Sequence, residues 1–205
     1  MIPKLLTPRL ILREMKSNDI FGYYEMRSDK ETMQLFGGPM LMNDIDIRDI
    51  VERLRRESES GTSYFWTIVL KEEREFIGYI RLVSYASDYF FTSFGISAES
   101  EYYVELLKYF DRTNGWELTY SLLKDERKKG IMREALPAVL DYCEINKIGP
   151  IYAKVNHLTN KPSINVLRRN NFKEYLPIVN NSKLPKEFDE SDCFDKEYGM
   201  IFIKN

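Results

Sequence analysis

The fold is decided by residues 116–135, which read Trp116-Glu117-Leu118-Thr119-Tyr120-Ser121-Leu122-Leu123-Lys124-Asp125-Glu126-Arg127-Lys128-Lys129-Gly130-Ile131-Met132-Arg133-Glu134-Ala135. The β-rich run Trp116–Leu123 predicts a strand that leads into a charged turn with one glycine. The turn opens a predicted helix over Gly130–Ile145, in which apolar residues repeat every four positions. The stretch therefore predicts a strand–turn–helix unit.

Such a unit can bind a phosphate or pyrophosphate group. The first N–H groups of a helix have no acceptor within the helix, and the helix dipole places partial positive charge there. Arg127, Lys128 and Lys129 add positive charge beside the same turn. The alternative is an ordinary solvated turn, and these residues alone leave both interpretations open.

The rest of the chain predicts further strands alternating with helices. The expected strands are Leu5–Arg13, Ser63–Leu70, Glu75–Val83, Ile151–Asn156, Phe172–Leu176 and Tyr198–Ile203, and the expected helices are Ile20–Arg27, Asp44–Glu57, Ser163–Arg169 and a short one at Glu99–Phe110. This order predicts an α/β fold of the mixed α+β kind. No linker or repeat divides residues 1–205, so we expect one domain.

The composition excludes several classes of function. A formal net charge of −2 argues against a broad basic surface for nucleic acid or an anionic membrane, and no apolar run is long enough to span a bilayer. One histidine and the two distant cysteines, Cys143 and Cys193, predict no metal site and no disulfide framework. The first residues lack the features of a signal peptide, so we expect a cytoplasmic protein.

Several short motifs occur along the chain in a characteristic order. They are Thr7-Pro8-Arg9-Leu10 with Asp19 after it, Trp66–Leu70 with Ile77-Gly78-Tyr79-Ile80, the turn Arg127–Met132 followed by Glu134-Ala135, and Asn160-Lys161-Pro162-Ser163 followed by Val166-Leu167 and Asn171-Phe172. Together these motifs resemble the GNAT acetyltransferases of the ribosomal-protein N-terminal type (RimJ/RimL-like). The resemblance covers roughly residues 5–83 and 115–175.

The sequence departs from the family pattern at three places. Met132 stands where the family has glycine or alanine, so either the helix lies farther from a bound pyrophosphate or the side chain turns aside. Asn171 replaces a glycine, and asparagine tolerates the same left-handed backbone. Residues 84–114 form an aromatic-rich insertion whose rings suit a pocket for a cationic amine, core packing or a homodimer surface.

The resemblance implies a central, mostly antiparallel sheet that splays between its fourth and fifth strands, Trp116–Leu123 and Ile151–Asn156. Acetyl-CoA would lie in the splay as the acetyl donor, and no metal would be needed. The residues implied in binding it are Leu122, Arg127, Lys128, Lys129, Gly130, Ile131, Met132, Asn160 and Ser163.

The resemblance also implies two catalytic residues. Glu117 would act as a general base toward the amine, although a cross-strand polar pair is the simpler role for it. Ser163 would protonate or hydrogen-bond the departing thiolate, although it also suits the first turn of a helix.

The expected function is acetyl transfer from acetyl-CoA to a primary amine. The acceptor is left open between a protein N-terminus and a small molecule such as an antibiotic or a polyamine. The alternative from another class of function is a binding module that retains affinity for acyl-CoA but has lost catalysis.

Overall fold

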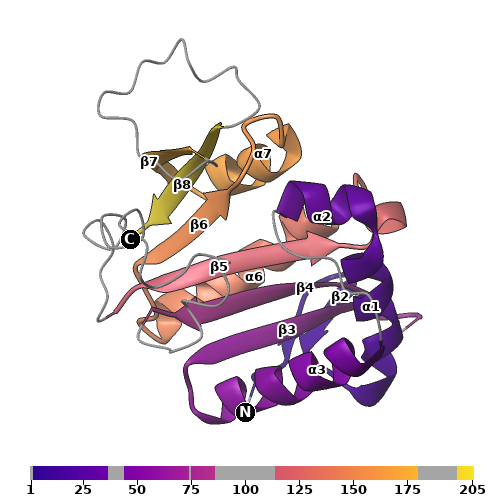
Figure 1. Cartoon of the computed structure of the whole chain (residues 1–205). Coiled ribbons are helices and arrows are strands. Elements are labelled where there is room, and N and C mark those ends of the chain that lie inside the picture. Colours follow the sequence, from indigo (N-terminus) through magenta and orange to yellow (C-terminus); the bar gives the residue numbers. More distant parts are fainter. Residues whose placement is uncertain (1, 37–43, 74, 86–113, 180–197) are drawn as a thin grey trace.

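The computed structural model describes residues 2–36, 44–73, 75–85, 114–179 and 198–205. Its centre is an eight-stranded sheet in the order β1-β2-β3-β4-β5-β6-β8-β7 (Figure 1). Only β5 and β6 run parallel to each other, so the sheet is mostly antiparallel, as predicted. The strands are β1 (Leu5–Leu6), β2 (Leu10–Arg13), β3 (Ser63–Leu70), β4 (Phe76–Ser84), β5 (Trp116–Leu122), β6 (Ile151–Val155), β7 (Lys173–Val179) and β8 (Tyr198–Lys204).

The helices confirm most of the sequence-based expectations. They are α1 (Ile20–Ser28), α2 (Lys30–Phe36), α3 (Asp44–Glu59), α6 (Ile131–Ile145) and α7 (Lys161–Arg169), with short 3-10 turns at Ser17–Asp19 and Lys124–Glu126. Helix α2 was not predicted from the sequence. The helix expected at Glu99–Phe110 lies outside the described residues.

The single strand expected at Leu5–Arg13 is a hairpin of β1 and β2, with Leu5 opposite Leu12. Pro8 accounts for the difference, because it has no N–H to donate to a ladder and its fixed φ favours a turn. The Thr7 N–H donates to the carbonyl oxygen of Leu10 at 3.1 Å, and this bond closes the turn.

Two hydrophobic clusters cover opposite faces of the sheet. The larger includes Leu118 from β5 with Met132 and Val139 from α6 and Leu167 from α7. The smaller joins α1 and α3 to β3 and β4 through Tyr23, Met26, Leu54, Phe65, Phe76 and Tyr79. Helices α6 and α7 therefore cover one face, and α1 and α3 cover the other. Figure 1 shows the same two layers around the sheet.

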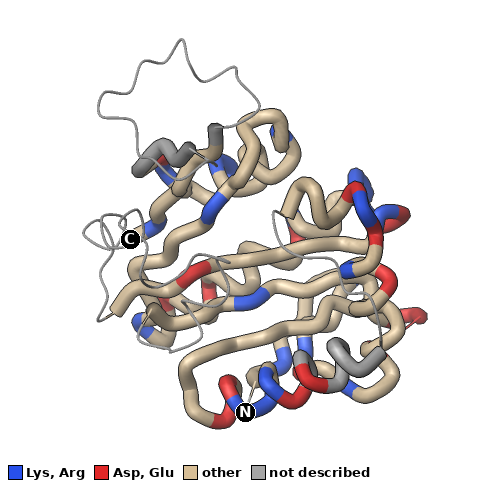
Figure 2. The backbone as a smooth tube through the Cα atoms, viewed as in Figure 1, with Lys and Arg blue, Asp and Glu red and all other residues tan. Residues whose placement is uncertain are grey.

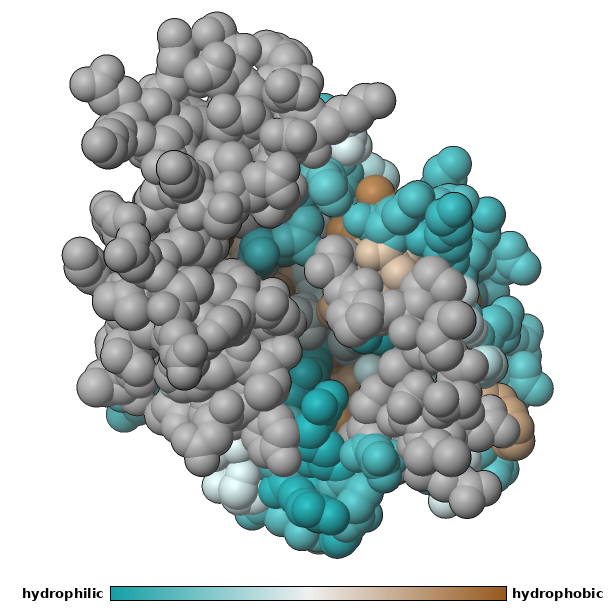
Figure 3. Space-filling model, viewed as in Figure 1, coloured by the Kyte–Doolittle hydropathy of each residue, from teal (hydrophilic) through white to brown (hydrophobic). Residues whose placement is uncertain are grey.

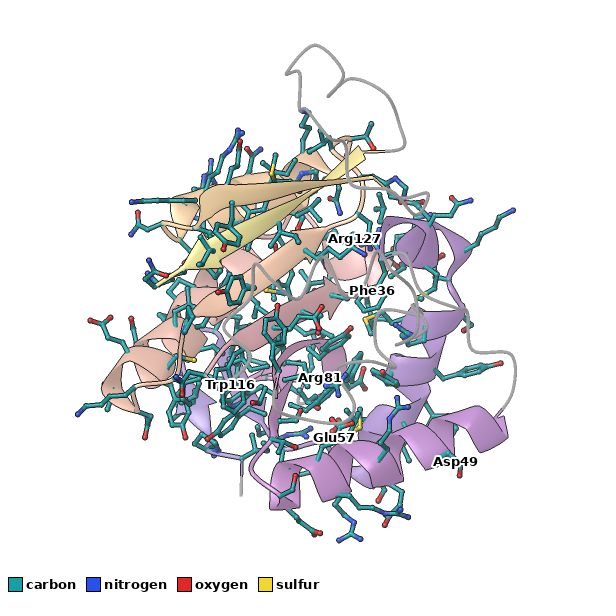
Figure 4. All side chains as sticks on the ribbon, turned by 60° about the vertical axis from the view of Figure 1, so that its left-hand side comes forward. Phe36, Asp49, Glu57, Arg81, Trp116 and Arg127 are labelled. Carbon is teal, nitrogen blue, oxygen red and sulfur yellow. The ribbon has the colours of Figure 1, made fainter. Side chains whose placement is uncertain are left out.

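A buried ion pair lies under α3. The guanidinium of Arg81 on β4 contacts the Glu57 carboxylate, whose side chain is fully buried, and the two point toward each other in Figure 4. Elsewhere, charged residues gather on the outer side of α3 and in the turn after β5 (Figure 2). The described residues on this side of the molecule are mostly hydrophilic, with small hydrophobic areas between them (Figure 3).

Candidate active site

The sheet opens between β5 and β6. Ladder pairs join these strands only at their amino ends, and the last pair is Leu118 with Ala153. β5 continues to Leu122 while it stays paired with β4 on its other side, and β6 continues to Val155 while it stays paired with β8. The two strands therefore part toward their carboxyl ends, which confirms the predicted splay. An extended ligand can lie in this opening beside the strand backbones.

The turn after β5 has a backbone suited to binding an anion. Lys128 (φ 63°) and Gly130 (φ 78°) adopt left-handed conformations, and Gly130 is the N-cap of α6 with no side-chain cap. The first hydrogen bond within the helix runs from the Glu134 N–H to the Gly130 carbonyl at 3.2 Å. The N–H groups before Glu134 therefore have no acceptor in the helix. Lys128, Lys129 and Gly130 are all exposed, so an anion can reach this end of α6.

Thr7 and Arg9, near the N-terminus of the chain, hold this turn in place through hydrogen bonds. Glu134 accepts hydrogen bonds from the Thr7 hydroxyl at 2.5 Å, from the Arg9 N–H at 2.8 Å and from the Arg9 guanidinium at 2.6 Å. The Arg9 guanidinium also donates to the Lys129 carbonyl at 3.1 Å. The pKa of Glu134 is lowered, because these hydrogen bonds outweigh the opposing effect of burial. The β1–β2 turn thus holds the first turn of α6 in place.

Ile131 and Met132 contribute backbone to this end of α6 and side chains to the core. Both side chains are buried in the cluster beneath α6, and Met132 is 6% exposed. Of the two outcomes that the sequence left open for Met132, the structure supports the second: the side chain turns aside. It does not cover the exposed turn.

Met132→Ala should therefore weaken folding more than ligand binding. Truncating a buried methionine typically costs about 2–5 kcal/mol, because it leaves a cavity. We expect a clear drop in the free energy of unfolding, measured by urea titration, with the acetyl-CoA dissociation constant within about twofold of wild type. A large loss of acetyl-CoA affinity with unchanged stability would contradict this placement of Met132.

Arg127 does not point to the exposed part of the turn. Its guanidinium contacts Glu31 at 3.4 Å and the Thr32 hydroxyl on α2, and its Nε donates to the Leu122 carbonyl at 3.4 Å. Lys129 pairs with Glu126 at 2.8 Å at an exposed position. Among the three cations that sequence reasoning grouped together, Lys128 and Lys129 are exposed and Arg127 lies largely beneath α2.

A hydroxyl pair spans the splay on the face covered by α6 and α7. The Tyr120 hydroxyl on β5 lies 2.8 Å from the Ser163 hydroxyl in the first turn of α7, and 3.2 Å from the Ser163 carbonyl oxygen. Asn160 caps this helix by accepting a hydrogen bond from the Ser163 N–H at 3.3 Å. Burial raises the pKa of Tyr120, and the hydrogen bond with Ser163 only partly opposes this. The phenol therefore keeps its proton at neutral pH and can donate a hydrogen bond.

Glu117 lies on the opposite face of β5 from Tyr120, because side chains alternate along a strand. It is 6% exposed and pairs in register with Tyr152, before the strands part. Lys154 on β6 is close enough for the Glu117 charge to raise its pKa, although burial has the larger effect and lowers it. The structure thus brings Asn160, Ser163 and Tyr120 together, and places Glu117 and Lys154 on the other face.

Sequence reasoning missed Tyr120, Lys154 and helix α2. Tyr120 lies on the same face of β5 as Trp116 and Leu118, against the larger hydrophobic cluster. Its hydroxyl has a polar partner only because α7 packs there, and the register between a strand and a later helix cannot be read from local sequence. For α2, the one available signal was Asp29, whose carboxylate caps the Thr32 N–H at 2.7 Å.

A sheet that splays between two parallel strands, with an exposed helix N-terminus after the first of them, is compatible with acyltransferases that use acyl-CoA. The family model described as "Acetyltransferase (GNAT) domain" matches residues 9–173, which is most of the chain. The chain belongs to the GNAT acetyltransferases, and it is an acetyl-CoA-dependent acyltransferase.

Solved structures show the same fold at low sequence identity. RimL, the ribosomal L7/L12 α-N-protein acetyltransferase, has a TM-score of 0.67 and 14% identity, over 100% of this chain and 94% of that one. The ribosomal-protein-S5-alanine acetyltransferase from Vibrio fischeri has a TM-score of 0.66 and 16% identity, over 98% and 96%. RimJ from Mycobacterium smegmatis in complex with CoA-disulfide has a TM-score of 0.64 and 18% identity, over 99% and 86%.

No curated protein matches the chain by sequence. Within the ranges that the structure describes, no cluster of side chains has the composition of a metal site. Among those same residues, no helix is both long enough and apolar enough to cross a bilayer.

Proposed function

We propose that this protein transfers the acetyl group of acetyl-CoA to a primary amine, either at a protein N-terminus or on a small molecule. The observation that carries the proposal is the splay itself. An exposed turn whose backbone suits an anion lies at its open end, and the Tyr120–Ser163 hydroxyl pair lies on one of its faces. The names of the RimL and S5-alanine structures support a protein N-terminus as the first acceptor to test.

In this proposal the turn after β5 binds the pyrophosphate. The N–H groups at Gly130, Ile131 and Met132 would donate to it, and Lys128 and Lys129 would add positive charge. The Leu122 backbone and the Asn160 side chain would contact the pantetheine arm in the splay. Arg127 would contribute only its positive charge, and from a distance, because its guanidinium already has partners on α2.

The chemistry needs one proton removed and one hydrogen bond supplied. The amine must lose a proton to attack the thioester carbonyl, and Glu117 is the proposed base. As the carbon–sulfur bond breaks, the thiolate needs a proton or a hydrogen-bond donor, and we assign this to Ser163 together with Tyr120. Because Glu117 and the hydroxyl pair lie on opposite faces of β5, the amine would approach from the face of α1 and α3, and the thiolate would leave toward α7.

No covalent intermediate on the enzyme is needed, because the acetyl group passes directly from sulfur to nitrogen. Positioning of the two reactants supplies much of the rate, and acid or base catalysis adds about 10²–10⁴-fold. Cys143 has no part in this scheme. It is buried in the core, and burial raises the pKa of its thiol to about 12, so it is not a nucleophile at neutral pH.

The test is release of the CoA thiol from acetyl-CoA in the presence of a panel of amines. The panel contains peptides that begin with serine or alanine, the same peptides with a blocked N-terminus, spermidine and an aminoglycoside. We expect thiol release that depends on one class of free amine, with mass spectrometry locating one acetyl group on that amine. Acetyl-CoA binding without thiol release for any amine would support the non-catalytic binding module instead.

A further inference from the structure

The open end of the splay is bridged on both faces. On the face of α6 and α7, the bridge is the contact between Tyr120 and Ser163. On the other face, the bridge is helix α2, which lies beside the carboxyl ends of β5 and β6 in Figure 1. Because β5 and β6 share no ladder pair beyond Leu118 and Ala153, contacts of this kind set the width of the opening.

The start of α2 is held from the β5 side. The Arg127 guanidinium contacts the Glu31 carboxylate at 3.4 Å and donates to the Thr32 hydroxyl. Lys124, from the same turn, contacts the other Glu31 oxygen at 2.8 Å. These cations lie within one short segment just after β5, so the β5 end of the splay and the start of α2 are tied together.

The end of α2 is held from the β6 side. The side-chain amide of Asn156, the residue after β6, donates to the carbonyl oxygen of Phe36. The Arg27 guanidinium from α1 lies 4.8 Å from the centre of the Phe36 ring. Helix α2 is therefore tied to the β5 side at its start and to the β6 side at its end. Arg127 and Phe36 are labelled in Figure 4.

Arg127 joins the start of α2 to the end of β5. It is 25% exposed, and its guanidinium contacts two side chains on α2 while its Nε donates to the Leu122 carbonyl at the end of β5. A guanidinium holds several acceptors in a fixed planar arrangement, whereas the three donors of a lysine ammonium rotate on one nitrogen and fix no such geometry. Lys128 and Lys129, by contrast, are exposed beside the proposed phosphate site.

We propose that Arg127 is a positioning residue that holds α2 across the open end of the splay, and so shapes the acceptor side of the site. The effect on the acceptor amine rests on the proposed function. The contacts of Arg127 with α2 and with the end of β5, which we call the brace, are part of the structure itself. In this account the acceptor amine passes α2 to reach the thioester. The phosphates of the donor interact with the turn through Lys128, Lys129 and the backbone.

The test compares Arg127→Lys with Lys129→Gln. The first keeps the positive charge but loses the fork, and the second removes a charge from the turn without touching α2. For Arg127→Lys we expect the KM of the best amine from the panel to rise about tenfold, with the acetyl-CoA dissociation constant within about twofold of wild type. For Lys129→Gln we expect the acetyl-CoA dissociation constant to rise several-fold.

Thr32→Val is the second variant, because it removes an Arg127 partner from α2 and leaves the turn after β5 unchanged. It also removes the bond from the Thr32 hydroxyl to the Asp29 carboxylate, whereas the bond from the Thr32 N–H to Asp29 remains. Arg127→Lys leaves both Asp29 bonds in place and is therefore the variant that assigns the effect to Arg127. Amide hydrogen exchange over residues 30–36 gives a readout that does not depend on activity. We expect it to be about tenfold faster in Arg127→Lys and in Thr32→Val than in wild type, and unchanged in Lys129→Gln.

The proposal is overturned if Arg127→Lys weakens acetyl-CoA binding as much as Lys129→Gln does while exchange in α2 stays unchanged. Arg127 would then be a phosphate ligand. If the wild-type protein fails to bind acetyl-CoA, the proposed function fails, and faster exchange in Arg127→Lys and Thr32→Val would still support the role of Arg127 in holding α2.

Discussion

Gly130→Glu is expected to abolish acetyl-CoA binding, and this is the largest effect that the structure predicts. Gly130 has a φ of 78° at the N-cap of α6, a conformation that residues with side chains rarely adopt. A glutamate there would bring bulk and a negative charge to the turn that is proposed to bind the pyrophosphate, and would repel the phosphates. Losing two charge-assisted hydrogen bonds, at about 1.5–3 kcal/mol each, corresponds to about 100-fold or more in affinity.

Gly130→Ala is the matched control. A methyl group at this position would have the Arg9 guanidinium at 3.6 Å as its nearest neighbour, so it fits without a clash. The left-handed backbone would still cost about 1–2 kcal/mol, but no charge would enter the site. Calorimetry should give a modest loss of affinity for alanine and no detectable binding for glutamate. Wild-type affinity in Gly130→Glu, with an intact circular dichroism spectrum, would mean that this turn does not bind the donor.

Tyr120→Phe and Ser163→Ala should each lower turnover by about 100-fold, with little change in acetyl-CoA affinity. Each change removes one member of the hydroxyl pair that is proposed to hydrogen-bond the departing thiolate. Both variants should fold. Phenylalanine keeps the ring in its place, and without the serine hydroxyl Tyr120 still has the Ser163 carbonyl oxygen at 3.2 Å.

The double variant Tyr120→Phe/Ser163→Ala shows whether the two hydroxyls act together or independently. If the hydroxyls act as one unit, removing both should cost little more than removing either. Melting curves must accompany the kinetics, because Ser163 lies in the first turn of α7. Full turnover in both single variants would remove the proposed acid and leave positioning as the source of the rate.

Glu117→Gln tests the proposed base, which lies on the opposite face of β5 from Tyr120 and Ser163. The amide keeps the shape of the side chain but cannot accept the proton of the amine. If Glu117 is the base, turnover should fall mainly below the pKa of the acceptor amine, where the free amine is scarce. An equal loss at all pH values, together with lower stability, would indicate that Glu117 is instead a structural partner of Lys154.

The parts of the site that follow from local sequence were predicted well. The strand, the glycine turn and the helix at residues 116–145 are encoded by neighbouring residues, and Gly130 is the N-cap at which α6 begins. The splay followed from the family resemblance. The N-terminal strand was predicted as one piece because Leu10 and Leu12 alternate with Ile11 and Arg13 in the manner of a strand. Pro8 was not recognised as a turn between two shorter strands.

The parts that depend on packing between distant segments were not predicted. The grouping of Arg127 with its neighbours as a phosphate-binding cation stays a prediction. Its contacts with Glu31 and Thr32, more than ninety positions earlier in the chain, were not foreseen. Helix α2 has only seven residues, which is too short for a clear hydrophobic period. The pairing of Tyr120 with Ser163 likewise depends on how α7 packs against β5.

The central claim is that the turn after β5 and the adjoining splay bind acetyl-CoA. The most direct measurement is calorimetric titration of the wild-type protein with acetyl-CoA, accompanied by thermal unfolding. The account predicts saturable binding of one molecule per chain and stabilisation by about 2.7 kcal/mol at ~100 times the dissociation constant. No binding heat and no shift in melting temperature at about millimolar acetyl-CoA would contradict it.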